Sequence, residues 1–392
     1  MNPLSLLQPL MSTSIPFNCP YMTGRELWLI SQAHNSGQLA GDGNFTKRCH
    51  TWLENHFGST KALLTHSCTS ALEMAAILAD IQPGDEVIMP SYTFVSTANA
   101  FVLRGGVPVF VDIRPDTLNL DESLVEAAIT DRTRAIVPVH YAGVGCEMAP
   151  LQDLANQYDL LLIEDAAQAM MASTHGKPLG SQGHLGCLSF HETKNIISGE
   201  GGALLVNDAR FAHRAEIIRE KGTNRSQFFR GEVNKYTWVD IGSSYLPGEV
   251  IAAFLYAQLE EARSIISRRL TLWEHYHQRL EPLEQAGKLR RPIIPDHCQH
   301  NAHMYYILVE DLATRTALIE QLKQQGINSV FHYVPLHSSP AGQRLAKVHG
   351  SMENTNLVSE RLLRLPMFTQ LEVSQIEAIV TSIASFYSNK WV

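Results

Sequence analysis

Short apolar runs alternate with helix-length segments through the first half of the chain, and this alternation constrains the fold more than any other feature. The runs are rich in Val, Ile and Leu and cover residues 62–65, 86–89, 107–113, 135–139, 160–163, 187–190 and 203–206. Segments with helical patterns lie between several of them, at residues 70–80, 121–129 and 149–158. This order predicts an α/β fold with a mainly parallel sheet and helices on both faces.

The pattern changes after about residue 247. Two long helical stretches, 249–268 and 270–286, are followed by a mixture of strand-like runs at 304–309 and 328–333 and helices at 314–325 and 373–386. A chain of 392 residues, 45% of them hydrophobic, can bury a large core and divide into two domains. We expect an N-terminal extension, a large α/β domain and a smaller C-terminal α+β domain, at residues 1–14, 15–260 and 261–392.

Composition restricts the partners and the compartment. The net charge of −8 argues against nonspecific nucleic-acid binding, and no uncharged apolar stretch approaches the roughly 18 residues of a membrane helix. The six cysteines are widely spaced without a Cys-x-x-Cys pair, which is typical of reduced thiols. Residues 1–17 lack the basic start of a signal peptide. We therefore expect a cytoplasmic protein that binds neither nucleic acid nor membrane.

Lys194 and Asp165 are the candidate catalytic residues. Asp165 ends the run at 160–163 and Lys194 follows the run at 187–190, so both are expected at carboxyl ends of strands, where functional groups of open α/β sheets gather. A lysine amine can hold an aldehyde cofactor as a Schiff base, and an aspartate can pair with a protonated pyridine nitrogen. Either residue alone is more simply a solvated charge or a helix cap. Together they predict a pyridoxal-phosphate enzyme.

Two neighbouring segments could hold such a cofactor. Ser67-Cys68-Thr69-Ser70 offers hydroxyls and backbone N–H groups where a strand gives way to a helix, which is a favourable place for a phosphate. The simpler interpretation is a helix cap, and one residue can serve both purposes. Phe94 follows the next strand and could stack on a flat ring, although buried aromatic residues usually belong to the core.

Five sequence blocks resemble the DegT/DnrJ/EryC1/StrS family of sugar aminotransferases, and the resemblance extends from about residue 15 to residue 386. The blocks are residues 90–105, 138–143, 189–195, 219–231 and 331–337. The resemblance implies the aspartate-aminotransferase fold (fold type I), pyridoxal 5′-phosphate as cofactor, and a homodimer with active sites at the interface.

The resemblance also implies a role for each matching residue. Lys194 would hold the cofactor and act as general base, Asp165 would pair with the pyridinium nitrogen, and Phe94 would stack on the ring. Gln168 would lie beside the ring hydroxyl. Cys68, Thr69 and Ser189 would hold the phosphate. Ser244 stands where the family usually has an asparagine that completes the phosphate site of the partner subunit.

The substrates follow from the same resemblance, which implies L-glutamate as amino donor and dTDP-4-dehydro-6-deoxy-D-glucose, aminated at C4, as acceptor. Residues 214–230 carry five basic and two acidic side chains, a local charge of +3 that would attract a diphosphate. A solvated helix face is the alternative. The candidate substrate residues are Lys221, Arg225, Arg230, His332 and His337.

Three further expectations concern metals and alternative functions. His184, His191, His332 and His337 show no convincing zinc-ligand arrangement with carboxylates, so we expect no metal. An aminotransferase for another keto-sugar nucleotide, for instance at C3, is the nearer alternative. A non-catalytic regulatory relative is the more distant one, and Lys194 argues against it and against the family's dehydratases, in which histidine replaces that lysine.

Overall fold

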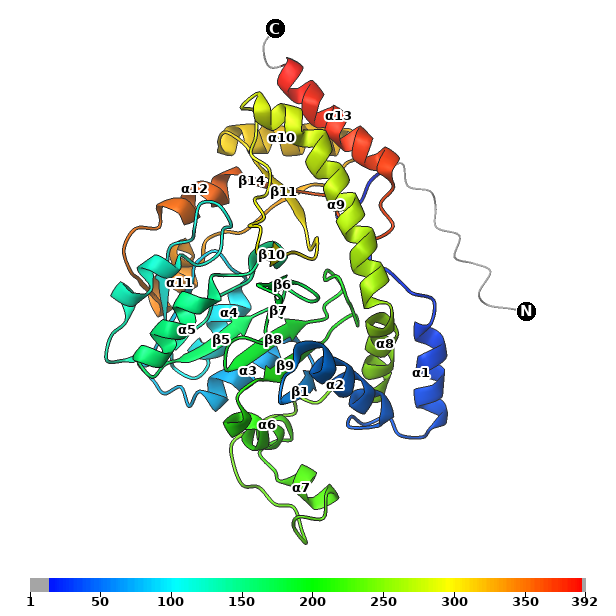
Figure 1. Cartoon of the computed structure of the whole chain (residues 1–392), viewed down its shortest axis with the longest axis vertical. Coiled ribbons are helices and arrows are strands. Elements are labelled where there is room, and N and C mark those ends of the chain that lie inside the picture. Colours follow the sequence, from blue (N-terminus) through cyan, green and yellow to red (C-terminus); the bar gives the residue numbers. More distant parts are fainter. Residues whose placement is uncertain (1–13, 390–392) are drawn as a thin grey trace, which may run out of the picture.

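The structure, a computed structural model, describes residues 14–389, so all of the predicted extension except Ser14 lies outside the described residues. Its centre is an eight-stranded sheet in which only β9 runs antiparallel to the others. The sheet confirms the predicted mainly parallel arrangement (Figure 1). Its strands, in spatial order, are β1 (Lys61–Thr65), β9 (Gly202–Val206), β8 (Leu185–Ser189), β5 (Leu161–Asp165), β4 (Thr133–Ile136), β2 (Glu86–Pro90), β3 (Val107–Val111) and β13 (Lys347–Val348).

Helices cover both faces of this sheet because successive strand residues point to opposite sides. In β1, Leu63 packs into one apolar cluster, whereas Ala62 and Leu64 pack into another. The first cluster is covered by α3 (Cys68–Leu78), α4 (Val95–Val102) and α6 (Ala212–Arg219). The opposite face is covered by α1 (Glu26–Asn35), α2 (Asn44–Phe57), α5 (Met148–Gln157) and α8 (Glu249–Glu260).

The prediction of an α-helix at residues 121–129 is wrong. Two short 3₁₀ turns, Glu122–Leu124 and Glu126–Ala128, occupy the segment. Only Val125 and Ala128 bury apolar side chains there, and so short a segment gains too little packing to hold a regular α-helix.

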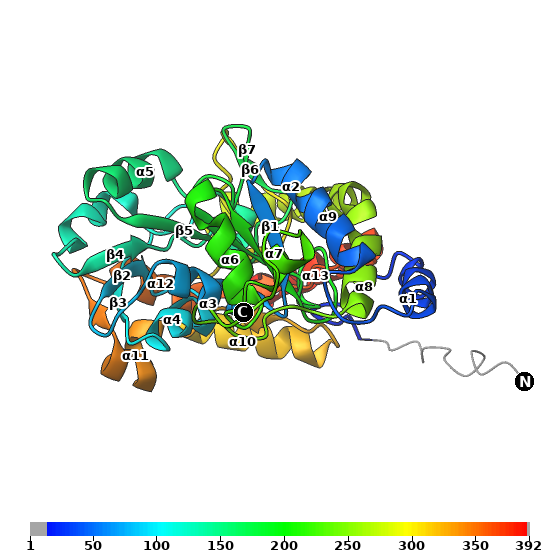
Figure 2. The ribbon, with the colours of Figure 1, turned by 90° about the horizontal axis from the view of Figure 1, so that it is seen from below.

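A second, three-stranded sheet forms from the C-terminal part of the chain (Figure 1). It is separate from the large sheet, whose strands β2, β3, β4 and β5 are seen from below in Figure 2. Its order is β11 (Tyr305–Leu308), β14 (Leu362–Leu365) and β12 (Val330–Phe331). The long helix α9 (Ala262–Gln285) begins right after α8, so the break falls at residue 261 and not near residue 269 as expected. Because β13 joins the edge of the large sheet, the two parts are interleaved, and the division at residue 260 stays a prediction. The remaining helices here are α10 (Leu312–Gln324), α11 (Pro340–Leu345), α12 (Glu353–Arg361) and α13 (Val373–Asn389).

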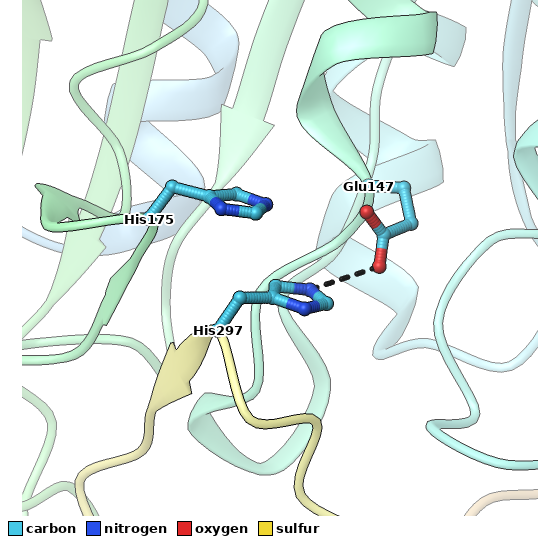
Figure 3. Close-up of side chains that lie close together, drawn as sticks. All are labelled: Glu147, His175 and His297. Carbon is cyan, nitrogen blue, oxygen red and sulfur yellow. Dashed lines mark ion pairs between the residues drawn. The ribbon is translucent and has the colours of Figure 1, made fainter.

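A third, small sheet joins two distant segments. Hairpin β6 (Ser173–Thr174) and β7 (Lys177–Pro178) pairs with β10 (Cys298–Gln299), and this pairing places His175 beside His297 (Figure 3). Within residues 14–389, no helix has the length and apolarity needed to cross a membrane.

Candidate active site

A cavity of about 560 Å³ opens at the carboxyl ends of β5 and β8. Asp165 and Lys194 both line it, as the strand-end argument predicts. The C-terminal part of the chain closes the cavity with His303, His332 and Arg364, among others. The cavity therefore lies between the large sheet and the three-stranded sheet that contains β14.

Asp165 is 5% exposed and is held by two hydrogen bonds. Its Oδ2 accepts from the Thr97 hydroxyl at 2.7 Å, and its Oδ1 accepts from the Ala167 N–H at 3.1 Å. Burial raises the pKa of this carboxyl group, and the two hydrogen bonds and Lys194 act in the opposite direction. The arrangement fixes a carboxylate that faces the cavity and can accept a further charged hydrogen bond.

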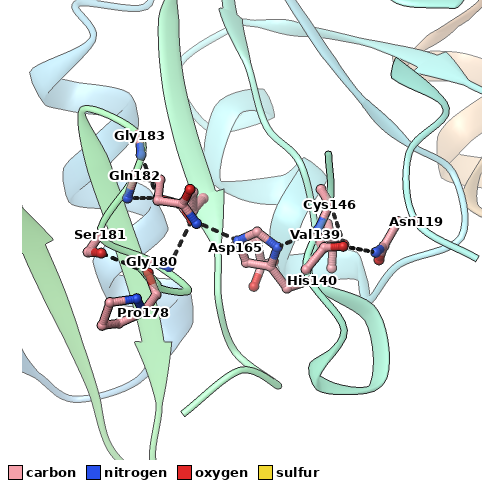
Figure 4. A network of polar contacts seen from close by, with 12 residues as sticks. Asn119, Val139, His140, Cys146, Asp165, Pro178, Gly180, Ser181, Gln182 and Gly183 are labelled. Carbon is pink, nitrogen blue, oxygen red and sulfur yellow. Dashed lines mark hydrogen bonds and ion pairs between the residues drawn. The ribbon is translucent and has the colours of Figure 1, made fainter. Parts of the chain in front are cut away.

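A buried polar network supports the strand end beneath Asp165 (Figure 4). His140 and Glu164 are fully buried, and their side chains meet at 2.8 Å. The Cys146 N–H donates to Nδ1 of His140, so Nε2 carries the proton and donates to Glu164. The Glu164 carboxylate also accepts from the N–H groups of residues 180, 182 and 183. This network ties β5 to the loop that leads into β8.

Lys194 lies in the turn that follows β8, where its own N–H donates to the carbonyl of His191 at 2.8 Å. Burial lowers the pKa of the Lys194 amine, partly opposed by the nearby Cys68 and Asp165. A lowered pKa enlarges the neutral fraction, which is the nucleophilic form.

The start of α3 forms a polar corner of the cavity together with β8. Cys68, Thr69 and Ser189 line the cavity there, and the Thr69 hydroxyl is 2.7 Å from the Ser96 hydroxyl. Ser67 caps the helix by accepting from the Ser70 N–H at 3.1 Å, which leaves earlier N–H groups for an anion. A Cβ on Gly202 would lie 2.5 Å from the Cys68 nitrogen, so glycine is required where β9 passes this corner. The corner fits a phosphate group.

Three other predicted residues also line the cavity. Phe94 is 58% exposed at its rim. Gln168 accepts from the Ala142 N–H at 2.7 Å and donates to the Tyr333 hydroxyl at 3.1 Å. His332 lies 2.9 Å from the Tyr141 hydroxyl, and burial lowers the pKa of its ring well below the usual value.

The other predicted residues lie outside this cavity. His337 is 2.8 Å from the Ser91 hydroxyl, and Ser244 pairs with Glu220 in an isolated β-bridge. The basic residues near α7 (Arg225–Phe229) are close to carboxylates of their own chain. Lys221 and Arg225 lie 3.5 and 3.6 Å from Glu220, and Arg230 contacts Glu216 at 2.9 Å and Glu232 at 2.6 Å. Glu216 and Glu220 are already included in the +3 counted from the sequence. The remaining charge is largely compensated by carboxylates outside residues 214–230, which are Glu232 beside Arg230, Asp240 beside Arg214 and Asp42 beside Arg219.

The sequence analysis missed Arg364, Tyr333, His303 and Thr97, which all line the cavity. Arg364 is the most informative because its buried Nε has no hydrogen-bond partner, and no ion pair found within residues 14–389 includes it. Burial lowers the pKa of its guanidinium, which lies over the ring of Phe17 at 4.7 Å. The sequence carries no signal for this residue, since its isolation depends on how β14 packs.

Comparison with known proteins gives consistent results. The family model described as "DegT/DnrJ/EryC1/StrS aminotransferase family" matches residues 20–384. The uncharacterized protein MJ1066 of Methanocaldococcus jannaschii is 34% identical over 353 residues, 88% of this chain and 91% of that protein. The aminotransferase TlmJ from Streptoalloteichus hindustanus superposes with a TM-score of 0.88 at 28% identity, covering 96% of this chain and 100% of TlmJ. The PLP form of Spr1654 from Streptococcus pneumoniae superposes with a TM-score of 0.88 at 25% identity, covering 97% and 100%.

These similarities show both the fold class and the family of this chain. The fold is that of the fold-type I aminotransferases, in which pyridoxal phosphate is the cofactor. The chain belongs to the DegT/DnrJ/EryC1/StrS aminotransferase family. It is a pyridoxal-phosphate-dependent sugar aminotransferase, which needs an amino donor and a keto-sugar acceptor.

Proposed function

We propose that Lys194 and Asp165 are the catalytic residues of this aminotransferase. The observation that carries the proposal is their position in one cavity, at the ends of β8 and β5, beside the polar corner at the start of α3. Cys68, Thr69 and Ser189 would hold the cofactor phosphate at that corner. Phe94 would cover the ring, and Gln168 would lie beside the ring hydroxyl.

Each catalytic group has a defined task. Bound pyridoxal phosphate supplies an electron sink for the carbanion that forms when a proton leaves the donor α-carbon. The Lys194 amine would take that proton from the donor α-carbon and deliver it to the cofactor. In the second half-reaction it would carry a proton from the cofactor to the sugar carbon that receives nitrogen. Asp165, held by Thr97 and the Ala167 N–H, would accept a hydrogen bond from the ring nitrogen and keep that nitrogen protonated.

The donor is L-glutamate in our proposal, and Arg364 supports a donor with an α-carboxylate, that is, an amino acid. The Arg364 guanidinium lies at the wall of the cavity and has no carboxylate partner in the described chain. A buried charge without a partner lowers the stability of the protein, unless a ligand supplies the opposite charge. The α-carboxylate of an amino acid has the planar geometry that arginine grips with two hydrogen bonds. Arg364 would orient the donor so that its α-hydrogen faces Lys194.

The acceptor is dTDP-4-dehydro-6-deoxy-D-glucose in our proposal. The chain would then be a dTDP-4-amino-4,6-dideoxygalactose transaminase, the enzyme of enterobacterial common antigen synthesis that blocks such as 219–231 and 331–337 resemble. His332 at the cavity wall would contact the sugar. An aminotransferase for a different keto sugar, aminated at C3, is the alternative.

A homodimer accounts for the predicted residues outside the cavity. Lys221, Arg225, Arg230 and Ser244 lie away from the cavity of their own chain, so they would reach substrate or phosphate in the partner's site. His337 lies on the same loop as His332, and its contact with Ser91 holds that loop in place. The role of His337 would therefore be indirect.

The test is a two-step reaction with purified protein. L-Glutamate should bleach the visible absorption band of the bound cofactor, and the amino form should then aminate dTDP-4-dehydro-6-deoxy-D-glucose at C4. Lys194→Ala should abolish both half-reactions, whereas Lys323→Ala, an exposed lysine of α10, should leave them intact. A protein that binds no pyridoxal phosphate would overturn the catalytic assignment. Turnover of a 3-keto isomer without turnover of the 4-keto sugar would overturn only the acceptor.

A further inference from the structure

Glu147, His175 and His297 form a compact cluster on the small sheet, and none of them lines the catalytic cavity. Each can offer one ligand atom, and the three atoms lie within 4.8 Å of one another. Nε2 of His297 is 3.0 Å from Oε1 of Glu147. The rings of His175 and His297 stack in parallel at 4.4 Å, with both directed toward the side on which Glu147 lies (Figure 3).

The His297 ring nitrogen is unusual for an atom so close to a carboxylate. Nε2 of His297 is shielded from solvent and has no hydrogen-bond partner, although the Glu147 oxygen is within reach. In the tautomer that is protonated at Nδ1, Nε2 carries a lone pair, and this lone pair and the Glu147 carboxylate oxygen are then both available to bind a third centre.

The ligand types favour a divalent transition metal. Two imidazoles and one carboxylate form the ligand set of many three-ligand zinc sites, in which a fourth position holds water. Calcium and magnesium prefer oxygen ligands alone, and two histidines disfavour them. Metal–ligand distances of about 2 Å require the ligand atoms to close by roughly an ångström. The His175 ring must also turn out of its parallel stack on His297, because lone pairs in parallel ring planes do not meet at one centre. The side chain of His175 is exposed and can make that movement.

The backbone holds the three residues in place without a metal. His175 occupies the first turn position of the β6–β7 hairpin, in left-handed conformation with φ of 49°, and its N–H donates to the His297 carbonyl at 2.8 Å. The pairing of Thr174 with Cys298 sets the two histidines side by side. Glu147 occupies the N-cap position of α5. Because the cluster is already assembled, binding would not require ordering a loop.

We infer that Glu147, His175 and His297 bind a divalent transition metal of the zinc type, in contrast to the sequence analysis, which considered other histidines and expected no metal. The ion joins the β6–β7 hairpin, the start of β10 and the start of α5. Four residues after His297, the Asn301 side chain donates to the carbonyls of Gln168 and Met170, at 2.8 and 2.9 Å. The metal therefore braces a segment that packs against the cavity wall, and the inference stands independently of the substrate.

The experiment is a calorimetric titration of chelator-treated, desalted holoenzyme with Zn²⁺. We expect one site per chain in the wild type. His175→Asn, His297→Ala and Glu147→Gln should each weaken binding at least about tenfold, the scale on which even outer-shell changes alter metal affinity. Asparagine is chosen at position 175 because it tolerates the left-handed conformation. His34→Ala, an exposed histidine of α1, is the matched control and should bind like the wild type.

A second readout separates the proposed site from binding elsewhere. Co²⁺ should give a visible absorption band in the wild type and in His34→Ala, and the band should be absent from His297→Ala. Zn²⁺ should also raise the melting temperature of the wild type but not of His297→Ala. The cofactor absorption of each variant shows whether it is folded. Equal Zn²⁺ affinity in the wild type and in folded variants of all three residues would overturn the inference.

Discussion

At the scale of single residues, burial prepares Lys194 for reaction with an aldehyde. An amine must lose its proton before it attacks a carbonyl, and the folded protein lowers the pKa of this amine from 10.5 by removing it from water. The same burial raises the pKa of Asp165, while the hydrogen bonds from Thr97 and Ala167 favour its charged form. One environment thus favours the neutral form of the amine and holds a carboxylate in the same cavity.

The lowered pKa predicts how cofactor loading depends on pH. The neutral fraction of Lys194 rises as pH increases through its pKa, so the rate at which cofactor-free protein binds pyridoxal phosphate should rise with pH and then level off. The midpoint should lie below 10.5, the pKa of an ordinary lysine. Absorbance after rapid mixing measures the rate, and lysine acetylated only on its α-nitrogen, with a free ε-amine, is the reference in solution. A midpoint equal to that of the reference would contradict the burial argument.

At the scale of elements, one buried carboxylate joins the starts of two helices. Glu249, in the first turn of α8 and 2% exposed, accepts from the N–H groups of Gly43, Phe45 and Thr46 and from the Thr46 hydroxyl. These N–H groups lie at the start of α2 and have no partner within that helix. The negative charge also suits the positive end of the helix dipole. Glu249 thereby fixes the position of α2 against α8.

Glu249→Gln should therefore destabilise the protein. The amide keeps the size of the side chain but replaces one acceptor oxygen by a donor that faces backbone N–H groups, a loss of about 1–3 kcal/mol for a buried group. Urea unfolding followed by circular dichroism measures the change. Glu320→Gln, an exposed residue of α10, is the control and should change the free energy of unfolding by less than about 0.5 kcal/mol. A change for Glu249→Gln as small as that of the control would show that water replaces the lost hydrogen bonds.

At the scale of the whole molecule, the segment around α7 projects from the protein and exposes several large apolar side chains. It extends away from the large sheet in Figure 1. Its exposed apolar side chains include Phe229 at 69% and Trp238 at 79%. Such a concentration on one projection is typical of an interaction surface. The dimer proposed above would bury it and would bring the adjacent basic residues to the partner's site.

Trp238→Asp should weaken this dimer. A buried tryptophan at an interface contributes on the order of 2 kcal/mol or more, so the dissociation constant should increase by at least about tenfold. Sedimentation velocity over a dilution series measures it. Leu312→Asp, at an exposed apolar residue of α10, should leave the mass unchanged. A wild type that sediments as a single chain at all concentrations would contradict the dimer.

Several elements could be predicted from the sequence because their signals are local. Strands such as β1 and β5 are short apolar runs between turn residues, and the side on which each residue packs follows from the alternation of side chains. The sequence analysis did not predict β14, because Leu362–Leu365 directly follows α12 and resembles a continuation of the helical pattern of α12. The positions of Asp165 and Lys194 at one edge of the sheet followed from strand order alone.

By itself, the sequence determined the α/β class, the mainly parallel sheet and the cavity residues that lie at strand ends. Only the tertiary structure decided that Arg364 faces the cavity without a carboxylate partner, that the basic residues near α7 are paired, and that Glu147 meets His175 and His297. The physical reason is distance along the chain. Which charges and ligands meet depends on how strands far apart in sequence pair, as β6 does with β10, and no local pattern records that pairing.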